Sequence, residues 1–122
     1  MDYQLLSRRP VTQLRAYTMA SHPLFVDSPE LKQTFLRAAL SLPEGFNPRT
    51  ATMMTEWRKE ANSNTEIIQR ALTYFNREQF HYTLNPPLLS KHTVDEFLFE
   101  TREGFCEHYA SAFTVMMRMA GI

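Results

Sequence analysis

The strongest periodic pattern in the chain is an apolar stripe that starts shortly after Ser63. Its members recur at helical spacing: Ile67, Ile68, Ala71, Leu72 and Phe75. In front of the stripe, Ser63 and Glu66 match a capping box, in which each side chain satisfies the free backbone N–H of the other residue. The pattern predicts an amphipathic helix with one face in the core.

Other segments carry helix signals of the same kind. Ser28, followed by a proline and an acid, predicts a helix start, and Asn47 before Pro48 predicts a second one. Thr93 and Glu96 match another capping box, which opens a short helix through residues 97–99. A last helix is expected over residues 105–119, with Gly121 as its stop.

Extended structure is expected in two places. Alternation around residues 11–17 predicts one or two strands within residues 3–20, and residues 81–84 are predicted to form a short strand that ends at a proline pair. We therefore divide the chain into a strand-containing N-terminal segment, residues 1–24, and a predominantly helical part, residues 25–122.

The composition is that of a globular protein without a marked charge. Of its 122 residues, 43% are hydrophobic and 21% charged, which is unlike a disordered chain. The 13 Lys and Arg balance the 13 Asp and Glu, which argues against a nucleic-acid partner. No apolar run approaches the roughly 18 to 20 residues that cross a bilayer, and no signal-peptide pattern follows Met1.

The chain's one cysteine, Cys106, lies two residues after Gly104 at the predicted start of the last helix. A thiol there meets unpaired backbone N–H groups and the positive end of the helix dipole, which favour the nucleophilic thiolate. A lone cysteine beside aromatic residues is more often a small buried apolar residue. Local spacing leaves both interpretations open.

A cysteine nucleophile needs a base, and the candidates are four histidines. His108 is two residues from Cys106 on a helix, so their side chains should point in different directions. His22 and His92 adjoin predicted turns and are expected in exposed loops, and His81 opens the short strand. None is a convincing partner. The spacing of these residues does not match a zinc site, and we predict no metal and no cofactor.

Residues 104–113 resemble the nucleophile segment of the transglutaminase-like superfamily: glycine, any residue, cysteine, two residues, an aromatic residue, alanine. Residues 80–87, 94–99 and Arg102 resemble that superfamily's bacterial branch, in which a membrane region of several passes precedes an extracytoplasmic domain. Short early segments are similar to it as well: residues 9–11, 47–49 and 57–58. The resemblance covers most of the chain and is most specific over residues 80–121.

The resemblance implies an α+β fold, a papain-like transglutaminase core, of which this chain is a predominantly helical fragment with short N-terminal strands. It implies that Cys106 attacks a glutamine side-chain amide of a protein or peptide, and that an amine or water then accepts the acyl group. The family's His and Asp lie on strands after the cysteine helix, so we expect the fragment alone to be inactive. It also implies a periplasmic domain of a bacterial inner-membrane protein.

Two points stay open on the sequence. Tyr82 lies near the region that supplies an oxyanion-hole donor in that branch, and the alternative is a strand tyrosine packed on the helix. The chain is either part of an acyltransferase or a non-catalytic helical scaffold or interaction module of the cell envelope. Because the family's cysteine helix packs on a following sheet, we also expect either self-association, with the last helix and its Met116 and Met117 at the contact, or poorly ordered final residues.

Overall fold

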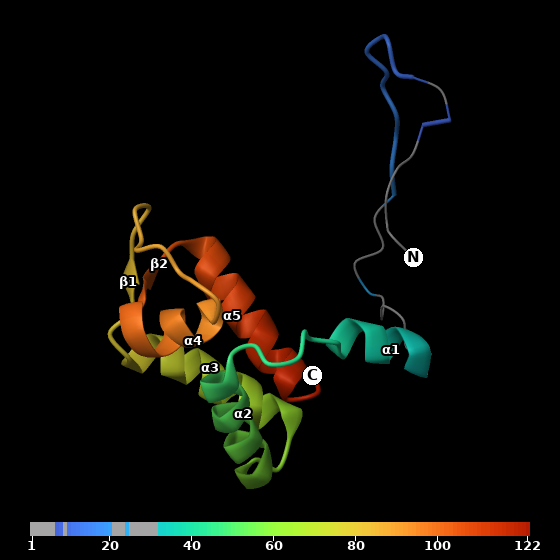
Figure 1. Cartoon of the computed structure of the whole chain (residues 1–122). Coiled ribbons are helices and arrows are strands. Elements are labelled where there is room, and N and C mark those ends of the chain that lie inside the picture. The colour runs from blue at the N-terminus through green and yellow to red at the C-terminus, as the bar shows by residue number, and fades with distance from the viewer. Residues whose placement is uncertain (1–6, 9, 21–23, 25–31) are drawn as a thin grey trace. The chain divides into compact units, whose positions relative to one another are not determined.

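The computed structural model describes residues 7–8, 10–20, 24 and 32–122, and the chain divides into two compact units, Met1–Glu30 and Leu31–Ile122. The second unit holds all the helices and strands assigned in the described residues (Figure 1). In chain order they are α1 (Gln33–Leu40), α2 (Pro48–Glu60), α3 (Asn64–Arg77), β1 (His81–Tyr82), α4 (Thr93–Glu96), the π-helix η1 (Phe97–Thr101), β2 (Glu103–Gly104) and α5 (Cys106–Met119). The predicted α+β class with mostly helical content is confirmed.

The strand predicted around residues 11–17 is wrong for the part of the N-terminal unit that the structure describes. Residues 10–20 are exposed and belong to no helix or strand. Alternation gives a segment two faces, but a strand forms only against a partner strand, and these residues have none in the described chain. Residues 3–6 and 9 lie outside the described residues, and the boundary after residue 24 remains a prediction.

Two of the predicted helix starts are found where the sequence places them. Helix α2 begins at Pro48, and α3 begins after Ser63, whose Oγ accepts a hydrogen bond from the Glu66 amide at 3.2 Å. The carboxylate of Glu66 accepts from the amide of Asn62 at 2.9 Å, one residue before the cap. The start predicted at Ser28 lies outside the described residues.

The capping box predicted for Thr93 and Glu96 is wrong by one residue. Helix α4 begins at Thr93 itself, and its N-cap is His92, which supplies no side-chain cap. The Glu96 carboxylate reaches back to the amide of His92 at 3.1 Å and to the hydroxyl and amide of Ser90 at 2.6 and 2.7 Å. Hydrogen bonds from Ser90 and then from His92 lower the pKa of Glu96. A carboxylate in the first turn of a helix can accept from more than one amide of the preceding loop, so its position in the sequence does not fix which residue is the N-cap.

Helices α2 and α4 exchange caps through two side chains. The Asn47 Oδ1 atom accepts from the amides of Val94 at 3.1 Å and Asp95 at 3.3 Å. In return the Asp95 carboxylate accepts from the amides of Arg49 at 2.9 Å and Thr50 at 2.8 Å, and from the Thr50 hydroxyl at 2.6 Å. Asp95 is only 3% exposed, and these bonds satisfy its buried charge. The exchange fixes the N-terminus of one helix against that of the other.

The core of the second unit forms between α2, α3, the α4–η1 segment and α5. Its largest fully buried apolar side chains come from each of them: Met54, Ile67, Phe97, Leu98 and Met116. Met116 and Met117 are both buried, so the prediction that these methionines form an intermolecular contact is wrong. The helices that precede α5 already cover this face. Self-association by another surface remains a prediction.

Residues 103–104 form β2, which pairs in parallel with β1. Figure 1 shows the pair beside the N-terminal end of α5. The register sets His81 opposite Glu103 and Tyr82 opposite Gly104. The Thr83 amide extends the pair by donating to the carbonyl of Gly104 at 2.9 Å. Pairing over a distance of about 20 residues is invisible to a local pattern, because each strand is only two residues long.

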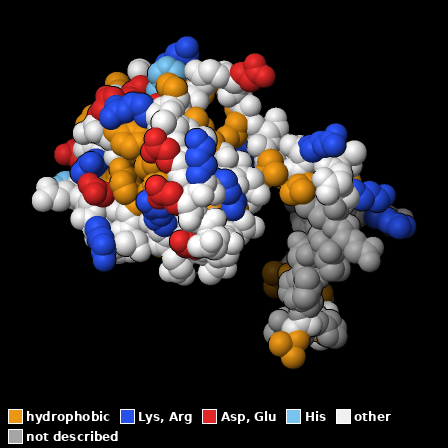
Figure 2. Space-filling view, turned by 90° about the horizontal axis from the view of Figure 1, so that it is seen from below, with side chains coloured by type: hydrophobic (Ala, Val, Ile, Leu, Met, Phe, Trp, Pro, Cys, Tyr) orange, Lys and Arg blue, Asp and Glu red, His pale blue; other side chains and the backbone are white. Residues whose placement is uncertain are grey.

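The surface shows no dominant charge on the face seen in Figure 2, where acidic, basic and hydrophobic side chains are intermixed. This agrees with the balanced composition. Among the described residues, no helix is long and apolar enough to span a membrane.

Candidate active site

Cys106 is the first residue of α5 and its side chain is exposed. The preceding residue, Phe105, is the N-cap in extended backbone, so the chain passes from β2 into α5 through this one residue. The prediction that the cysteine lies in the first turn of the last helix is confirmed. The alternative of a small buried apolar residue is wrong, because the thiol is accessible to solvent.

Gly104 is required by close packing at the base of this helix. A Cβ at this position would lie 2.7 Å from both Cβ and Cγ of His108 and 3.0 Å from a ring carbon of Phe97. The His108 ring is held there because its Nδ1 accepts a hydrogen bond from the Phe105 amide at 3.4 Å. The glycine of the sequence motif therefore lets β2 lie against the first turn of α5.

Replacing Gly104 by alanine should destabilise this unit by about 1–3 kcal/mol, the usual cost of overpacking a tight site. Urea denaturation followed by circular dichroism measures the loss. Ala110→Ser is the matched control, because Ala110 is an exposed small residue of the same helix and its change should stay within about 0.5 kcal/mol. Equal stability of the two variants would show that the His108 ring moves aside at no cost.

Tyr82 is brought to the cysteine's side of α5 by the strand pair and by Tyr109. The register places Tyr82 opposite Gly104, and its ring stacks on that of Tyr109 with centroids 6.4 Å apart and planes inclined by 22°. Tyr109 follows Cys106 by three residues, so the two side chains are neighbours on the helix surface. Burial, with a smaller contribution from Tyr82, raises the pKa of Tyr109. Packing of Tyr82 against the helix is thus observed, and its role in an oxyanion hole remains a prediction.

Two of the described histidines, His92 and His108, are half-buried and hydrogen-bonded within the fold, and the third, His81, is exposed. His108 is half-buried, with its ring 5.7 Å from that of Phe97 and 4.6 Å from that of Phe105 between centroids. The expectation that His92 lies in an exposed loop is wrong, because it is half-buried and its Nδ1 accepts from the Asn47 amide at 3.1 Å. His81 is exposed in β1. In the described part of the chain no hydrogen bond joins Cys106 to a histidine.

No group of three or more histidine, cysteine, aspartate or glutamate side chains in the described ranges is placed to hold a metal ion. His22 lies outside those ranges. Among the described residues, the reactive group at the start of α5 is therefore the accessible thiol of Cys106, and aromatic side chains lie near it.

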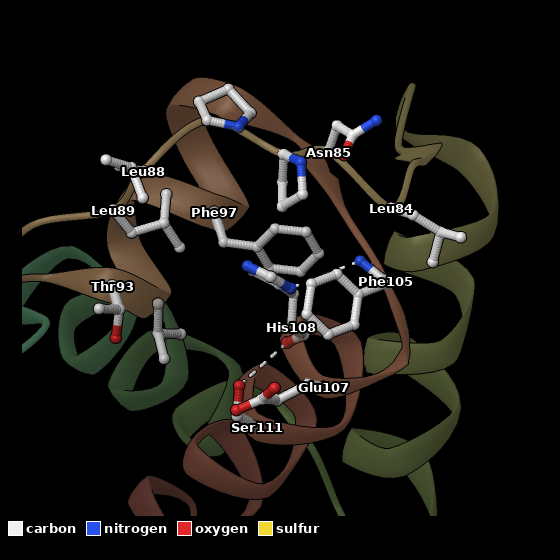
Figure 3. A pocket seen from close by; sticks show the side chains of 13 residues that line it. Leu84, Asn85, Leu88, Leu89, Thr93, Phe97, Phe105, Glu107, His108 and Ser111 are labelled. Carbon is white, nitrogen blue, oxygen red and sulfur yellow. Dashed lines mark hydrogen bonds between the residues drawn. The ribbon is translucent and has the colours of Figure 1, made fainter.

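A groove of about 770 Å³ lies along α5, and Cys106 is not among the residues that line it. Figure 3 shows the rings of Phe97, His108 and Phe105 in its interior, the segment from Leu84 to Leu89 along one wall, and Glu107 and Ser111 on α5. The Ser111 hydroxyl donates to the His108 carbonyl at 3.2 Å. No pattern in the sequence indicated this groove, because its walls come from segments about 20 residues apart.

The structure places the glycine and the cysteine of the motif that resembles the transglutaminase-like superfamily at β2 and at the first position of α5. The sequence model of that superfamily matches residues 51–122, and the chain belongs to it. The chain is 37% identical over 121 residues to a protein-glutamine gamma-glutamyltransferase of Pseudomonas aeruginosa. That match covers 99% of this chain and 18% of the relative. An uncharacterised protein of Bacillus subtilis, YebA, is 28% identical over 92 residues, which is 73% of this chain and 12% of that protein.

Solved structures show the same fold. The periplasmic domain of TgpA from Pseudomonas aeruginosa matches with a TM-score of 0.74 and 39% identity, over 76% of this chain and 32% of the solved chain. Its complex with ethylmercury matches with a TM-score of 0.73. The chain thus spans about a third of the solved domain and less than a fifth of the curated relative. The predicted family and fold are confirmed.

Proposed function

We propose that this chain contributes the nucleophile of a protein-glutamine acyltransferase, with Cys106 as the attacking residue. The observation that carries the proposal is the exposed thiol at the first position of α5. Membership of the superfamily and the likeness to a gamma-glutamyltransferase support the same chemistry.

The proposed reaction has two covalent steps. The Cys106 thiolate attacks the carbonyl carbon of a glutamine side chain, a C–S bond forms, and the C–N bond breaks as ammonia leaves with a proton from an acid. An amine or water then attacks the thioester carbonyl and loses a proton to the base, a C–N or C–O bond forms, the C–S bond breaks, and the sulfur leaves as the thiolate. Amides of the first turn of α5 and the Tyr82 hydroxyl are the candidates to stabilise the oxyanion of each step.

The acid and base of this reaction are not among the contacts of Cys106 in the described residues. We infer that a His and an Asp from outside these 122 residues complete the triad, as the family resemblance implies. The proposed location is extracytoplasmic, in a membrane-anchored protein, and its support is the likeness to a periplasmic domain. Protein or peptide glutamines are the proposed acyl donors.

The test of the proposed nucleophile is the rate at which iodoacetamide alkylates it. At pH 7 we expect Cys106 in the folded chain to react faster than free cysteine, as the general preference of helix N-termini for negative charge predicts. Mass spectrometry measures the rate, and the urea-unfolded chain is the control, because it keeps the residue and loses the helix. A rate at or below that of the unfolded chain would contradict the proposal and favour a non-catalytic scaffold.

A further inference from the structure

The side chain of His108 contacts both residues that lead from β2 into Cys106. Its Nδ1 atom accepts the hydrogen bond from the Phe105 amide at 3.4 Å, and its ring lies edge-on to the Phe105 ring, with planes inclined by 78°. Its Cβ and Cγ lie 2.7 Å from the place that a Cβ on Gly104 would take. His108 therefore restricts the chain on the N-terminal side of the thiol.

His108 occupies the helix position at which a capping box carries glutamate or glutamine. Phe105 is the N-cap of α5 and His108 is the third residue of the helix, so its side chain can reach back to the N-cap amide. Phe105 cannot supply the other half of a capping box, because its side chain has no oxygen. The bond from the Phe105 amide to Nδ1 is thus a side-chain bond that holds this helix start.

The surroundings of the His108 ring are mostly uncharged, and Figure 3 shows it between two phenylalanine rings. From η1 and β2 it faces a phenylalanine ring and a glycine, and the residues of α4 and of loop 84–89 that line the groove carry no ionisable side chain. On α5 itself the ionisable neighbours are Glu107 and Cys106. Because Nδ1 is an acceptor, the ring is neutral and its proton is on Nε2.

We propose, on the basis of the proposed function, that His108 is a positioning residue for the nucleophile. Its neutral imidazole holds the Phe105 amide, and this keeps Cys106 at the first position of α5. An imidazolium has N–H groups at both nitrogens and cannot accept this bond. Histidine takes up a proton between about pH 5 and 8. Protonation of His108 therefore releases the N-cap and lowers the reactivity of the thiol, because Cys106 loses its fixed place at the helix N-terminus.

The same geometry argues against His108 as the base of the reaction. Its Nδ1 is engaged by the Phe105 amide, and among the described residues no hydrogen bond joins it to Cys106. Residues two apart on a helix do not face each other. The effect of His108 on the thiol therefore passes through the backbone of the N-cap.

The experiment compares His108→Leu with His108→Asn in the 122-residue chain. Leucine has no acceptor, whereas the asparagine Oδ1 takes the place of Nδ1 and does not titrate. Hydrogen exchange followed by NMR and corrected for intrinsic rates should show about three-fold lower protection of the Phe105 amide in His108→Leu, a small effect because the bond is long. His108→Asn should retain the protection. Val115→Ala is the control for general destabilisation, because Val115 is a partly buried residue later in α5.

The pH dependence separates a positioning role from a merely structural one. From about pH 7.5 to 5.5 the protection of the Phe105 amide in the unchanged chain should fall toward that of His108→Leu, and in His108→Asn it should stay constant. Glu107→Gln is the control for the neighbouring carboxylate and should respond as the unchanged chain does. At the higher pH, iodoacetamide should alkylate Cys106 about three-fold more slowly in His108→Leu than in His108→Asn.

Three outcomes would each overturn the inference. They are equal protection of the Phe105 amide in His108→Leu and His108→Asn, protection in the unchanged chain that does not change with pH, and a Cys106 that reacts faster than in the unfolded chain but equally fast in both variants. If the folded chain alkylates no faster than the unfolded chain, the proposed function fails by itself. The exchange of the Phe105 amide still decides whether His108 holds the N-cap, since it does not depend on the thiol.

Discussion

Asp95→Ala is expected to lower the free energy of unfolding by about 3–5 kcal/mol, because three donors lose their acceptor and each unsatisfied buried group costs about 1–3 kcal/mol. The carboxylate is buried and accepts three hydrogen bonds from Arg49 and Thr50 at 2.6–2.9 Å. Without it two amides and a hydroxyl at the start of α2 lose their acceptor, and water cannot reach them freely. Since most domains are stable by only about 5–15 kcal/mol, such a loss leaves the chain close to unfolding.

Urea denaturation of the variant against the unchanged chain measures the loss. Glu100→Ala is the matched control, because Glu100 forms an exposed ion pair with Arg49 at 2.9 Å and should contribute less than about 1 kcal/mol. Asp95→Asn should give an intermediate loss, since its amide retains one acceptor oxygen but points a donor at another donor. A loss below about 1 kcal/mol for Asp95→Ala would show that α2 and α4 hold together without the exchanged caps.

The second large effect concerns turnover. The 122-residue polypeptide should transfer no detectable acyl group from a glutamine peptide to an amine, although its thiol alkylates. No described histidine is bonded to Cys106, and general acid–base catalysis contributes factors of about 10²–10⁴. A fluorescent alkylamine and a glutamine-containing protein provide the assay, with Cys106→Ala as the background. Incorporation above that background would mean that one of the chain's own histidines protonates the leaving ammonia.

Features that depend on neighbours in the sequence could be predicted. The positions of Cys106, Ser63 and Pro48 follow from signals within one helical turn, and the structure places each at a helix start. The motif around Cys106 also identified the family. Its glycine is needed for close packing with His108, and its cysteine lies at the start of α5, so both depend only on residues nearby in the sequence. The end of α5 near Gly121, which has a φ of +76°, could likewise be predicted from neighbouring residues.

Features that join distant segments could not be predicted. Asn47 precedes its own helix as predicted, but its side chain caps α4, and Asp95 caps α2, across 45 to 48 residues. His92 was expected in an exposed loop because its neighbours suggest a turn. It is half-buried, and its side chain contacts the Phe46 ring and the Asn47 amide, about 45 residues away. The alternation near residue 11 misled for the same reason, since extended structure depends on a partner that the pattern does not contain.

Only Phe105 separates β2 from α5, and this short connection restricts the position of the Cys106 sulfur. Before Phe105, the Gly104 carbonyl accepts a hydrogen bond from the Thr83 amide next to β1. After Phe105, the chain enters the hydrogen-bonded helix α5 directly at Cys106. No loop lies between them whose freedom must be lost when substrate arrives. The conformational entropy of positioning Cys106 is therefore lost during folding, so in the proposed reaction the arrival of substrate would have to order only the substrate.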